Sequence, residues 1–141
     1  MKKENNLQRF LDAQETAYPI ALAEVRNGRK HSHWMWFIFP QIKGLGYSST
    51  SQFYAIKDLE EAQAYLEHPL LGSRLVDICQ ELYKLESQDA YAIFGSPDDL
   101  KLKSSMTLFS ALPNTHAIFG LILDKFYQGN KDDKTLQILN Y

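Results

Sequence analysis

A basic run leads directly into an aromatic run in the first third of the chain. Arg29-Lys30-His31-Ser32-His33 is followed at once by Trp34-Met35-Trp36-Phe37-Ile38-Phe39. Cationic donors beside flat rings are the groups that hold a phosphate and stack a base or flavin ring. We therefore expect Lys30 and His33 to meet the phosphates of a nucleotide-like ligand, and the two tryptophans to stack on its ring. The alternative is that the basic side chains are solvated and both tryptophans anchor the core.

Polar residues interrupt the apolar stripes of several expected helices. Gln14, Asp98, Ser105 and Lys125 each occupy a position on such a stripe. An unpaired neutral group buried there would cost roughly 1 to 3 kcal/mol, and a charged group more. These side chains must therefore pair, extend to solvent or line a cavity, and together they favour a polar, ligand-binding pocket within the bundle. A lone lysine such as Lys125 more often extends its ammonium to water.

Other kinds of site are disfavoured by the spacing of their residues. Gly44-Leu45-Gly46 lacks the Lys-Ser/Thr ending of a phosphate-binding loop, and the chain has no Gly-x-Ser-x-Gly turn. The four histidines are dispersed and Cys79 is the only cysteine, so we predict neither a metal site nor a cofactor. Asp98-Asp99 suits the positive end of a helix better than a catalytic pair. Asp98 by itself is a candidate acid or base.

Length and charge limit the classes of protein to consider. A chain of 141 residues suits a single domain, and its net charge of -2 offers no basic field for duplex nucleic acid. Its apolar runs are far shorter than the roughly 18 residues that a membrane span requires. The start lacks the apolar segment of a secretory signal, and one cysteine cannot form an internal disulfide, so we predict a cytoplasmic protein. The oligomeric state stays open.

Capping signals and apolar periodicity predict helices along most of the chain. Cys79 lies on the stripe of the longest helix, where we expect a small buried hydrophobe. The expected helices begin at Asn6, near Pro19 (ending at Asn27-Gly28), at the capping box Asp58 and Glu61, at Pro69, at Ser96-Pro97, at Asn114 and at Asp133.

The segment from Gly28 to Lys57 departs from this helical pattern. It is long, aromatic and contains Gly44 and Gly46, and its only β-rich run, Trp34 to Phe39, has no second run to pair with. Loops of such length within a compact domain are usually either functional or wrongly assigned as loops. The sequence therefore predicts an all-α fold, a compact single-domain bundle over residues 1–141 with one long aromatic loop segment.

Motifs spread over nearly the whole chain resemble a bacterial family called domain of unknown function 1810. The resemblance implies a compact helical fold and no established activity. Some members carry the label calpastatin, an inhibitor that is disordered when free, unlike this patterned chain. The motifs are Ser32-His33-Trp34-Met35-Trp36-Phe37-Ile38-Phe39-Pro40-Gln41, Gly44-Leu45-Gly46, Tyr54-Ala55-Ile56, His68-Pro69-Leu70-Leu71-Gly72, Phe94-Gly95-Ser96-Pro97-Asp98-Asp99-Leu100-Lys101 and Ser104-Ser105-Met106-Thr107-Leu108-Phe109.

Two shorter segments are similar to the NADAR family of glycosidases, which act on ADP-ribose conjugates and riboflavin-pathway intermediates. Phe53-Tyr54-Ala55-Ile56-Lys57 and Leu123-Asp124-Lys125-Phe126-Tyr127-Gln128 carry this resemblance. It implies that Lys57 takes a lysine position from which an amine could attack the anomeric carbon or its open-chain aldehyde. Tyr54 stands where the family has glutamine and Thr50 where it has glutamate, so a general acid or base is missing.

These observations lead to three hypotheses. The first is an N-glycosidase-like enzyme acting on an ADP-ribose-type or other nucleotide ligand, with Lys57 as nucleophile at the mouth of a pocket walled by Trp34 or Trp36. Tyr54, Ser105 and Lys125 would add to its ligand-binding surface. The second is a binding module with the same pocket and no chemistry. The third is a structural or partner-binding protein whose aromatic residues all belong to the core.

Overall fold

Helices account for the secondary structure of the protein. The computed structural model describes residues 6–140, so the first five residues, on which part of the localisation argument rests, lie outside it. Within the described range there is no strand and one isolated parallel bridge, between Ile42 and Ile56. The all-α prediction is confirmed. The helices are α1 (Gln8–Arg26), α2 (Met35–Ile38), α3 (Ser49–Tyr54), α4 (Leu59–Glu67), α5 (Leu71–Lys84), α6 (Ala90–Phe94), α7 (Asp98–Ser110), α8 (Ile118–Tyr127) and α9 (Asp133–Leu139).

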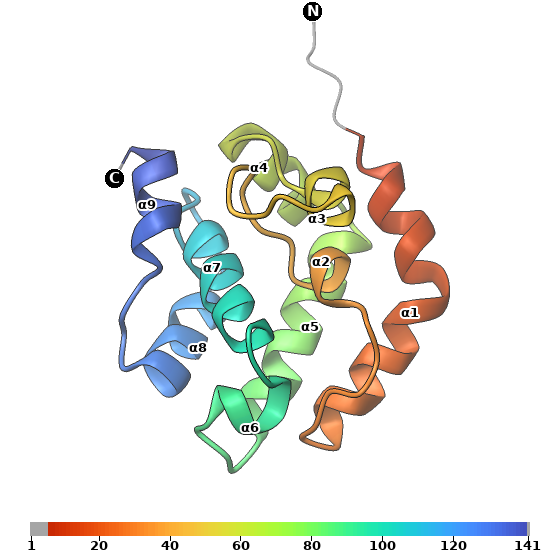
Figure 1. Ribbon diagram of the computed structural model, residues 1–141, viewed down its shortest axis with the longest axis vertical. Coiled ribbons are helices and arrows are strands. Elements are labelled where there is room, and N and C mark those ends of the chain that lie inside the picture. The colour runs from red at the N-terminus through yellow and green to blue at the C-terminus, as the bar shows by residue number, and fades with distance from the viewer. Residues whose placement is uncertain (1–5, 141) are drawn as a thin grey trace, which may run out of the picture.

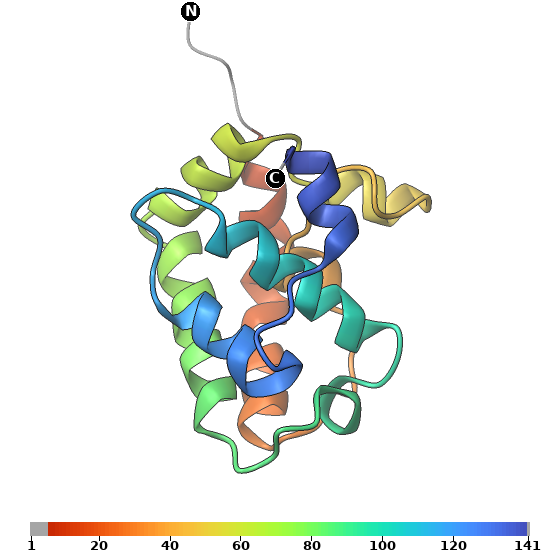
Figure 2. The ribbon, with the colours of Figure 1, turned by 90° about the vertical axis from the view of Figure 1, so that its left-hand side faces the viewer.

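The long helices pack around α5. Figure 1 shows α5 between α1 on one side and the α7–α8 pair on the other, and the same helices are in contact in the structure. Figure 2 shows that α7 crosses this arrangement at a steep angle to α5. The segment between α1 and α4 carries the short helices α2 and α3 and lies across the bundle. None of the helices in residues 6–140 combines the length and apolar character that a membrane span needs.

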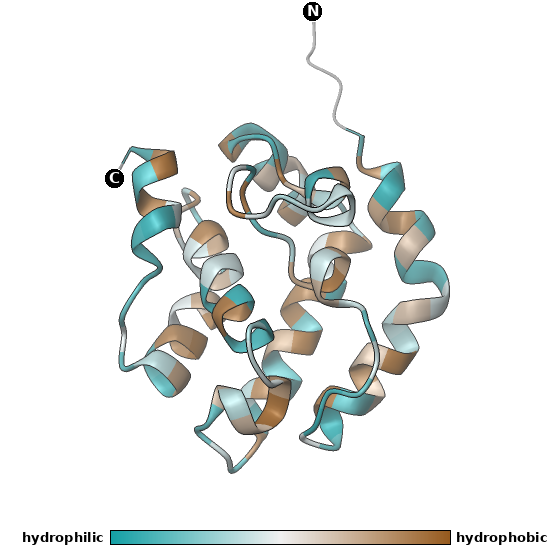
Figure 3. Ribbon diagram, viewed as in Figure 1, coloured by the Kyte–Doolittle hydropathy of each residue, from teal (hydrophilic) through white to brown (hydrophobic). Residues whose placement is uncertain are grey.

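The central place of α5 follows from its apolar stripe. Leu71, Leu75, Ile78 and Leu82 recur at intervals of three and four residues, and each is at most 1% exposed. Figure 3 shows the corresponding alternation of hydrophobic and hydrophilic residues along α1 and α5. Cys79 is completely buried on the same helix, and burial raises the pKa of its thiol, as expected of an inert core cysteine.

Gly72 allows α4 and α5 to approach each other closely. A Cβ atom at this position would lie 1.9 Å from the backbone oxygen of Leu66. Every other residue type would therefore force the end of α4 away from the start of α5. This contact explains why the motif His68-Pro69-Leu70-Leu71-Gly72 ends in glycine.

The prediction of a helix boundary near Pro19 is wrong, because α1 continues through it. Proline lacks the N–H that would bond to the carbonyl of Glu15, but both residues lie on the exposed face of the helix, where water can reach that carbonyl. Gln14, Ala21 and Val25 continue one buried face on both sides of the proline. Packing of this face outweighs the local cost of the proline.

The predicted helix starts are partly confirmed. Asp58 caps α4 as expected, accepting from the backbone N–H of Glu61 at 2.8 Å. Helix α9 begins at Asp133 as predicted. The remaining starts lie a few residues from the predicted ones, and Ser96 makes no cap, since α7 begins after Pro97 without a side-chain cap. Two histidines cap instead: His68 Nδ1 accepts from the backbone N–H groups of Leu70 and Leu71 at the start of α5, and His116 Nδ1 accepts from that of Ile118 at the start of α8.

A buried ion pair attaches α1 to the start of α4. Arg9 Nη2 lies 2.9 Å from Glu61 Oε1, and the two side chains are 7% and 2% exposed. Arg9 also donates to the backbone oxygens of Phe53 and Ala55, both at 2.9 Å, and Glu61 accepts from the backbone N–H of Lys57 at 3.0 Å. The pair therefore fixes the chain that connects α3 to α4.

We predict that replacing either member of this pair destabilises the protein strongly. Arg9→Met would leave the Glu61 carboxylate buried without its cation, and Glu61→Gln would do the same to Arg9, each at a cost of roughly 3 to 5 kcal/mol. Urea denaturation followed by circular dichroism measures the change. Glu60→Gln, at the exposed neighbouring position, serves as the control and should change stability by less than about 0.5 kcal/mol.

Candidate functional site

The basic and aromatic residues singled out from the sequence meet around one hollow of about 310 Å³. We call it the Trp36 hollow. Residues 30–37, which we call the aromatic segment, supply one wall of the hollow. The start of α3 supplies a second wall, and the first turn of α7 supplies a third. Its lining residues are Lys30, His33, Trp34, Met35, Trp36, Phe37, Ser48, Thr50, Asp98 and Lys101.

Two lysines and one aspartate form the charged part of this hollow. Lys30 Nζ lies 2.8 Å from Asp98 Oδ2, and Lys101 Nζ lies 3.1 Å from Asp98 Oδ1. Lys30 also donates to the backbone oxygen of Ser32 at 2.6 Å, and its side chain is only 8% exposed. Two positive charges against one negative charge leave this group with a net charge of +1, before any contribution from His33.

The Asp98 carboxyl is ionised at neutral pH. Burial raises its pKa, but the hydrogen bonds and charges of Lys30 and Lys101 outweigh burial and leave the pKa below the ordinary value. A carboxyl group in this state can accept hydrogen bonds, act as a base or stabilise a positive charge. It is poorly suited to the role of general acid, which requires a proton at neutral pH.

The two tryptophans differ in their access to the hollow. Trp34 is 1% exposed and packs against Phe39 and Phe94, with the Lys30 ammonium 4.9 Å from its ring centre. The stacking role predicted for Trp34 therefore does not fit, since the ring has no free face and serves as a core anchor. Trp36 is only half-buried, with the Lys101 ammonium 4.2 Å from its ring centre, and it is the tryptophan that a ligand can reach.

Glu24 on α1 holds the aromatic segment in place. Its Oε1 accepts from the backbone N–H groups of His31 and Ser32 at 2.8 and 2.9 Å and from Trp34 Nε1 at 2.9 Å, and its Oε2 accepts from Ser32 Oγ at 2.5 Å. Burial raises the pKa of Glu24, but these four donors together lower it to about 2. The Glu24 carboxylate thus positions both the Trp34 side chain and the backbone between Lys30 and Trp34.

Lys57 does not share this hollow, so its predicted place beside a tryptophan is wrong. It lines a separate hollow of about 410 Å³ with Ile42, Asp58 and residues of α9. The intervening helix α3 and the anchoring of Ala55 by Arg9 carry the chain away from Trp36 before Lys57 is reached. A short distance along the sequence is therefore a poor guide to distance in this segment.

Tyr54, Ser105 and Lys125 are not among the residues that line the Trp36 hollow. Tyr54 packs on Phe37 and lines a small neighbouring cavity of about 20 Å³. Ser105 is completely buried on α7, and its hydroxyl has no hydrogen-bond partner among the described residues. Lys125 donates to the backbone oxygens of Tyr83 and Leu85, so its ammonium caps the end of α5.

Lys101, Ser48 and Thr50 are the residues that sequence reasoning missed as parts of the site. The spacing of Asp98 and Lys101, three residues apart in the first turn of a helix, is a signal that could have identified the second lysine. Thr50 occupies the position where the NADAR resemblance implies glutamate, and it does line the hollow. That wall therefore offers a hydroxyl where a carboxylate was implied.

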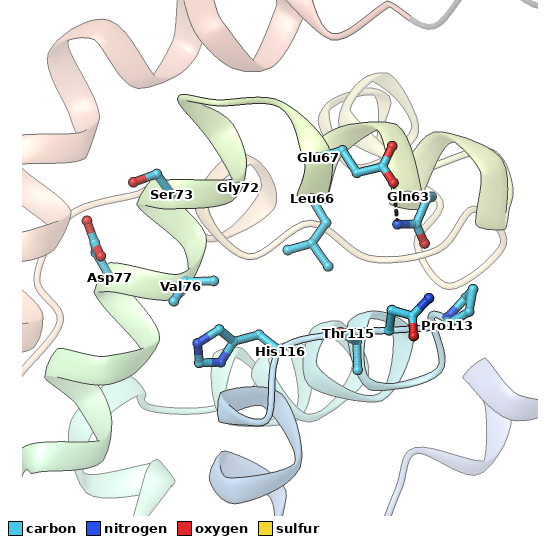
Figure 4. Close-up of a pocket in the computed structure, with 11 residues that line it drawn as sticks. Gln63, Leu66, Glu67, Gly72, Ser73, Val76, Asp77, Pro113, Thr115 and His116 are labelled. Carbon is cyan, nitrogen blue, oxygen red and sulfur yellow. Dashed lines mark hydrogen bonds between the residues drawn. The ribbon is translucent and has the colours of Figure 1, made fainter.

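A larger groove of about 890 Å³ lies between α4, α5 and the chain leading into α8 (Figure 4). It contains Ser73, Asp77 and His116, the residue types of a hydrolase triad. His116 Nδ1 is already bonded to the backbone N–H of Ile118, and Figure 4 shows the Ser73 hydroxyl pointing away from the imidazole. No hydrogen bond joins these side chains in the described part of the chain, so the groove lacks the geometry of a triad.

Gln14, predicted to need a partner, has three. Its amide nitrogen donates to the Phe37 oxygen at 2.8 Å and to the Tyr65 hydroxyl at 2.9 Å, and its oxygen accepts from Arg74 at 3.4 Å. It is 1% exposed, so it connects helices and lines no pocket. No group of three or more histidine, cysteine, aspartate or glutamate residues that could hold a metal ion occurs in residues 6–140.

We predict that Glu24 makes part of the stability of the protein dependent on pH. Its folded-state pKa of about 2 lies below the value of 4.5 expected when unfolded, so its contribution is present above about pH 4.5 and is lost as the pH falls toward 2. Urea denaturation at a series of pH values, followed by tryptophan fluorescence, measures this loss. Glu24→Gln should be less stable near neutral pH and should lose this part of the pH dependence, whereas Glu15→Gln, at an exposed position of the same helix, should behave as wild type.

Comparisons with known proteins agree with the fold and its motifs. The chain superposes on the crystal structure of the conserved hypothetical protein Rv1873 from Mycobacterium tuberculosis with a TM-score of 0.94 and 46% sequence identity, over 96% of this chain and 97% of that one. The comparison with curated proteins found no match. The similarity to the NADAR family is not shown by these comparisons. A family model described as protein of unknown function (DUF1810) matches residues 4–139, and the chain therefore belongs to that family.

Proposed function

We propose that this protein binds a small anionic ligand with an aromatic ring, of the nucleotide type, in the Trp36 hollow. The observation that carries the proposal is the meeting of Lys30 and Lys101 on one carboxylate beside a half-buried tryptophan. The two ammonium groups suit a phosphate, and the Trp36 ring suits a base or flavin ring. The proposal keeps the binding-module hypothesis and retains Trp36, but not Trp34, as a stacking residue.

The size and polarity of the hollow support a ligand of this class. Its volume of about 310 Å³ is at the lower end of the range of roughly 300 to 1,000 Å³ that small-molecule sites occupy. Met35 and Phe37 supply apolar wall, while Ser48 and Thr50 are exposed hydroxyl residues at its edge. This mixture matches a ligand that is apolar on its ring faces and polar at its sugar and phosphate.

A second candidate function, cleavage of an N-glycosidic bond in such a ligand, is favoured by the ionised Asp98. A carboxylate beside the anomeric carbon would stabilise the positive charge that develops there. Water would add to that carbon and give up a proton to the Asp98 carboxylate, the carbon–nitrogen bond would break, and the nitrogen would keep the electron pair and take up a proton. His33 lines the hollow and is the residue we assign to proton delivery.

Lys57 would serve as a nucleophile only for a substrate seated in the separate hollow that it lines. Borohydride reduction in the presence of ribose 5-phosphate, followed by mass spectrometry, would label wild type and leave Lys57→Ala unlabelled if this chemistry occurs. For the Asp98 route, release of the free base from ADP-ribose conjugates, measured by chromatography, should fall in Asp98→Asn and persist in Asp99→Asn.

We predict that nucleotides stabilise the protein and that Lys101→Met weakens their binding. A ligand at about 100 times its dissociation constant raises the free energy of unfolding by about 2.7 kcal/mol, which a thermal-shift screen of mononucleotides, ADP-ribose and flavin mononucleotide detects. Removing one hydrogen bond to a charged phosphate costs roughly 1.5 to 3 kcal/mol, so the affinity of Lys101→Met should fall at least about tenfold.

Lys103→Met is the matched control for this experiment. Lys103 lies on the same helix, but its ammonium is 5.9 Å from the Tyr127 ring centre and it does not line the Trp36 hollow. It should bind the nucleotide as wild type does. Equal weakening by both substitutions, or the absence of any stabilising nucleotide, would contradict the proposed site.

A further inference from the structure

Asp98 already occupies the cationic groups that an anionic ligand would use. Each of its carboxylate oxygens bonds to a different lysine, at 2.8 and 3.1 Å. A lysine ammonium has three N–H donors, and Lys30 directs donors to Ser32 and Asp98, while its burial leaves little room for water. A ligand anion that bonds to both lysines must therefore push Asp98 aside or share its partners.

This arrangement affects anions of different charge unequally. Displacing Asp98 costs the same free energy whichever anion takes its place. A ligand carboxylate has the same charge and shape as the group that it displaces, so it gains little over Asp98. A phosphate group carries about -1.5 to -2 charges at neutral pH and has three acceptor oxygens, so it can bridge both lysines and exceed the displacement cost.

We infer that Asp98 is a built-in competitor for Lys30 and Lys101, and that it makes the Trp36 hollow selective for ligands with phosphate or diphosphate groups over carboxylates. This inference rests on the proposed function, since it concerns the same hollow. It assigns Asp98 the role of a specificity-determining residue. The residue accordingly reduces affinity for every anion and excludes those that carry only one charge.

The test measures the binding of inorganic pyrophosphate and of acetate to wild type, Asp98→Asn and Asp99→Asn by calorimetry. Wild type should bind pyrophosphate and should not bind acetate measurably. Asp98→Asn should bind pyrophosphate about tenfold more tightly or better, because the carboxylate that competes for both lysines is gone, and acetate binding should become measurable.

Asp99→Asn controls for the loss of a carboxylate from the same helix turn. Asp99 Oδ1 accepts from the backbone N–H of Leu100, and Asp99 makes no ion pair with either lysine. It should bind both anions as wild type does. Circular dichroism of each variant confirms that the helices are intact.

Different outcomes separate the inference from the proposed function. Pyrophosphate binding that is unchanged or weaker in Asp98→Asn, or acetate binding to wild type as tight as that of pyrophosphate, overturns the inference alone. The inference alone is also overturned if nucleotides bind wild type but pyrophosphate binds neither wild type nor Asp98→Asn. If no nucleotide and no pyrophosphate binds any variant, the proposed function fails and the inference fails with it.

A measurement on wild type avoids any dependence on the folding of the Asp98 variant. Carbon-13 labelling of aspartate allows the Asp98 carboxyl to be titrated by nuclear magnetic resonance with and without pyrophosphate. Displacement from the lysines removes the contacts that lower its pKa, so the pKa should rise when pyrophosphate is bound. A pKa that does not change on saturation with pyrophosphate contradicts displacement.

Discussion

The hydrogen bonds to the Glu24 carboxylate are the constraint on which the candidate site depends. The chain that leaves α1 must enter the core at Trp34 without regular secondary structure to satisfy its polar groups. Glu24 accepts from two backbone N–H groups, a hydroxyl and the indole nitrogen of that stretch. Because buried polar groups are costly unless paired, this one carboxylate makes the burial of Trp34 possible. The positions of Lys30 and Trp36 on either side of Trp34 follow from it.

A second anchor holds the other end of the same segment. Arg9 and Glu61 bond to the backbone on both sides of Ile56 and set the path into α4. Between the two anchors Ile38, Phe39 and Ile42 are buried in the core, while Trp36, Ser48 and Thr50 line the hollow. Gly46 supports this path, since a Cβ atom there would lie 2.6 Å from the Ser51 side chain and 3.3 Å from the Trp36 ring. The segment is thus fixed at its ends, and its middle lines the hollow of the proposed site.

Asp98 links the stability of the protein to its proposed binding activity. Its pair with Lys30 attaches the first turn of α7 to the chain that leads into Trp34, whereas its pair with Lys101 lies within that turn. Removing one partner from a buried pair leaves a charge unpaired, so this contact resists change in the free protein. An anion that replaces the carboxylate supplies the missing charge and lets the contact open. Under the proposed function, the electrostatic balance that stabilises the folded chain would therefore also set which ligands can enter.

Local patterns were sufficient to predict most of the fold. The apolar stripe of α5, the Asp58 cap and the burial of Cys79 depend on residues close in sequence, and the structure confirms them. The helix boundary predicted near Pro19 was wrong for a tertiary reason. The buried face of α1 continues past the proline, and the packing of that face keeps the helix unbroken. The caps supplied by His68 and His116 were missed because their Nδ1 atoms accept backbone hydrogen bonds only in one orientation of the ring.

The sequence by itself determined which chemistry the site could contain, since the basic and aromatic run already placed Lys30, His33 and Trp36 within seven residues. Only the tertiary structure decided which partners these residues have. The fold places Asp98 and Lys101 beside Lys30, His33 and Trp36, and it buries Trp34. It also makes Lys125 a helix cap and places Lys57 in a separate hollow. The physical reason is that charged and aromatic side chains take their roles from burial and from the charges around them, and residues far apart in the chain supply both.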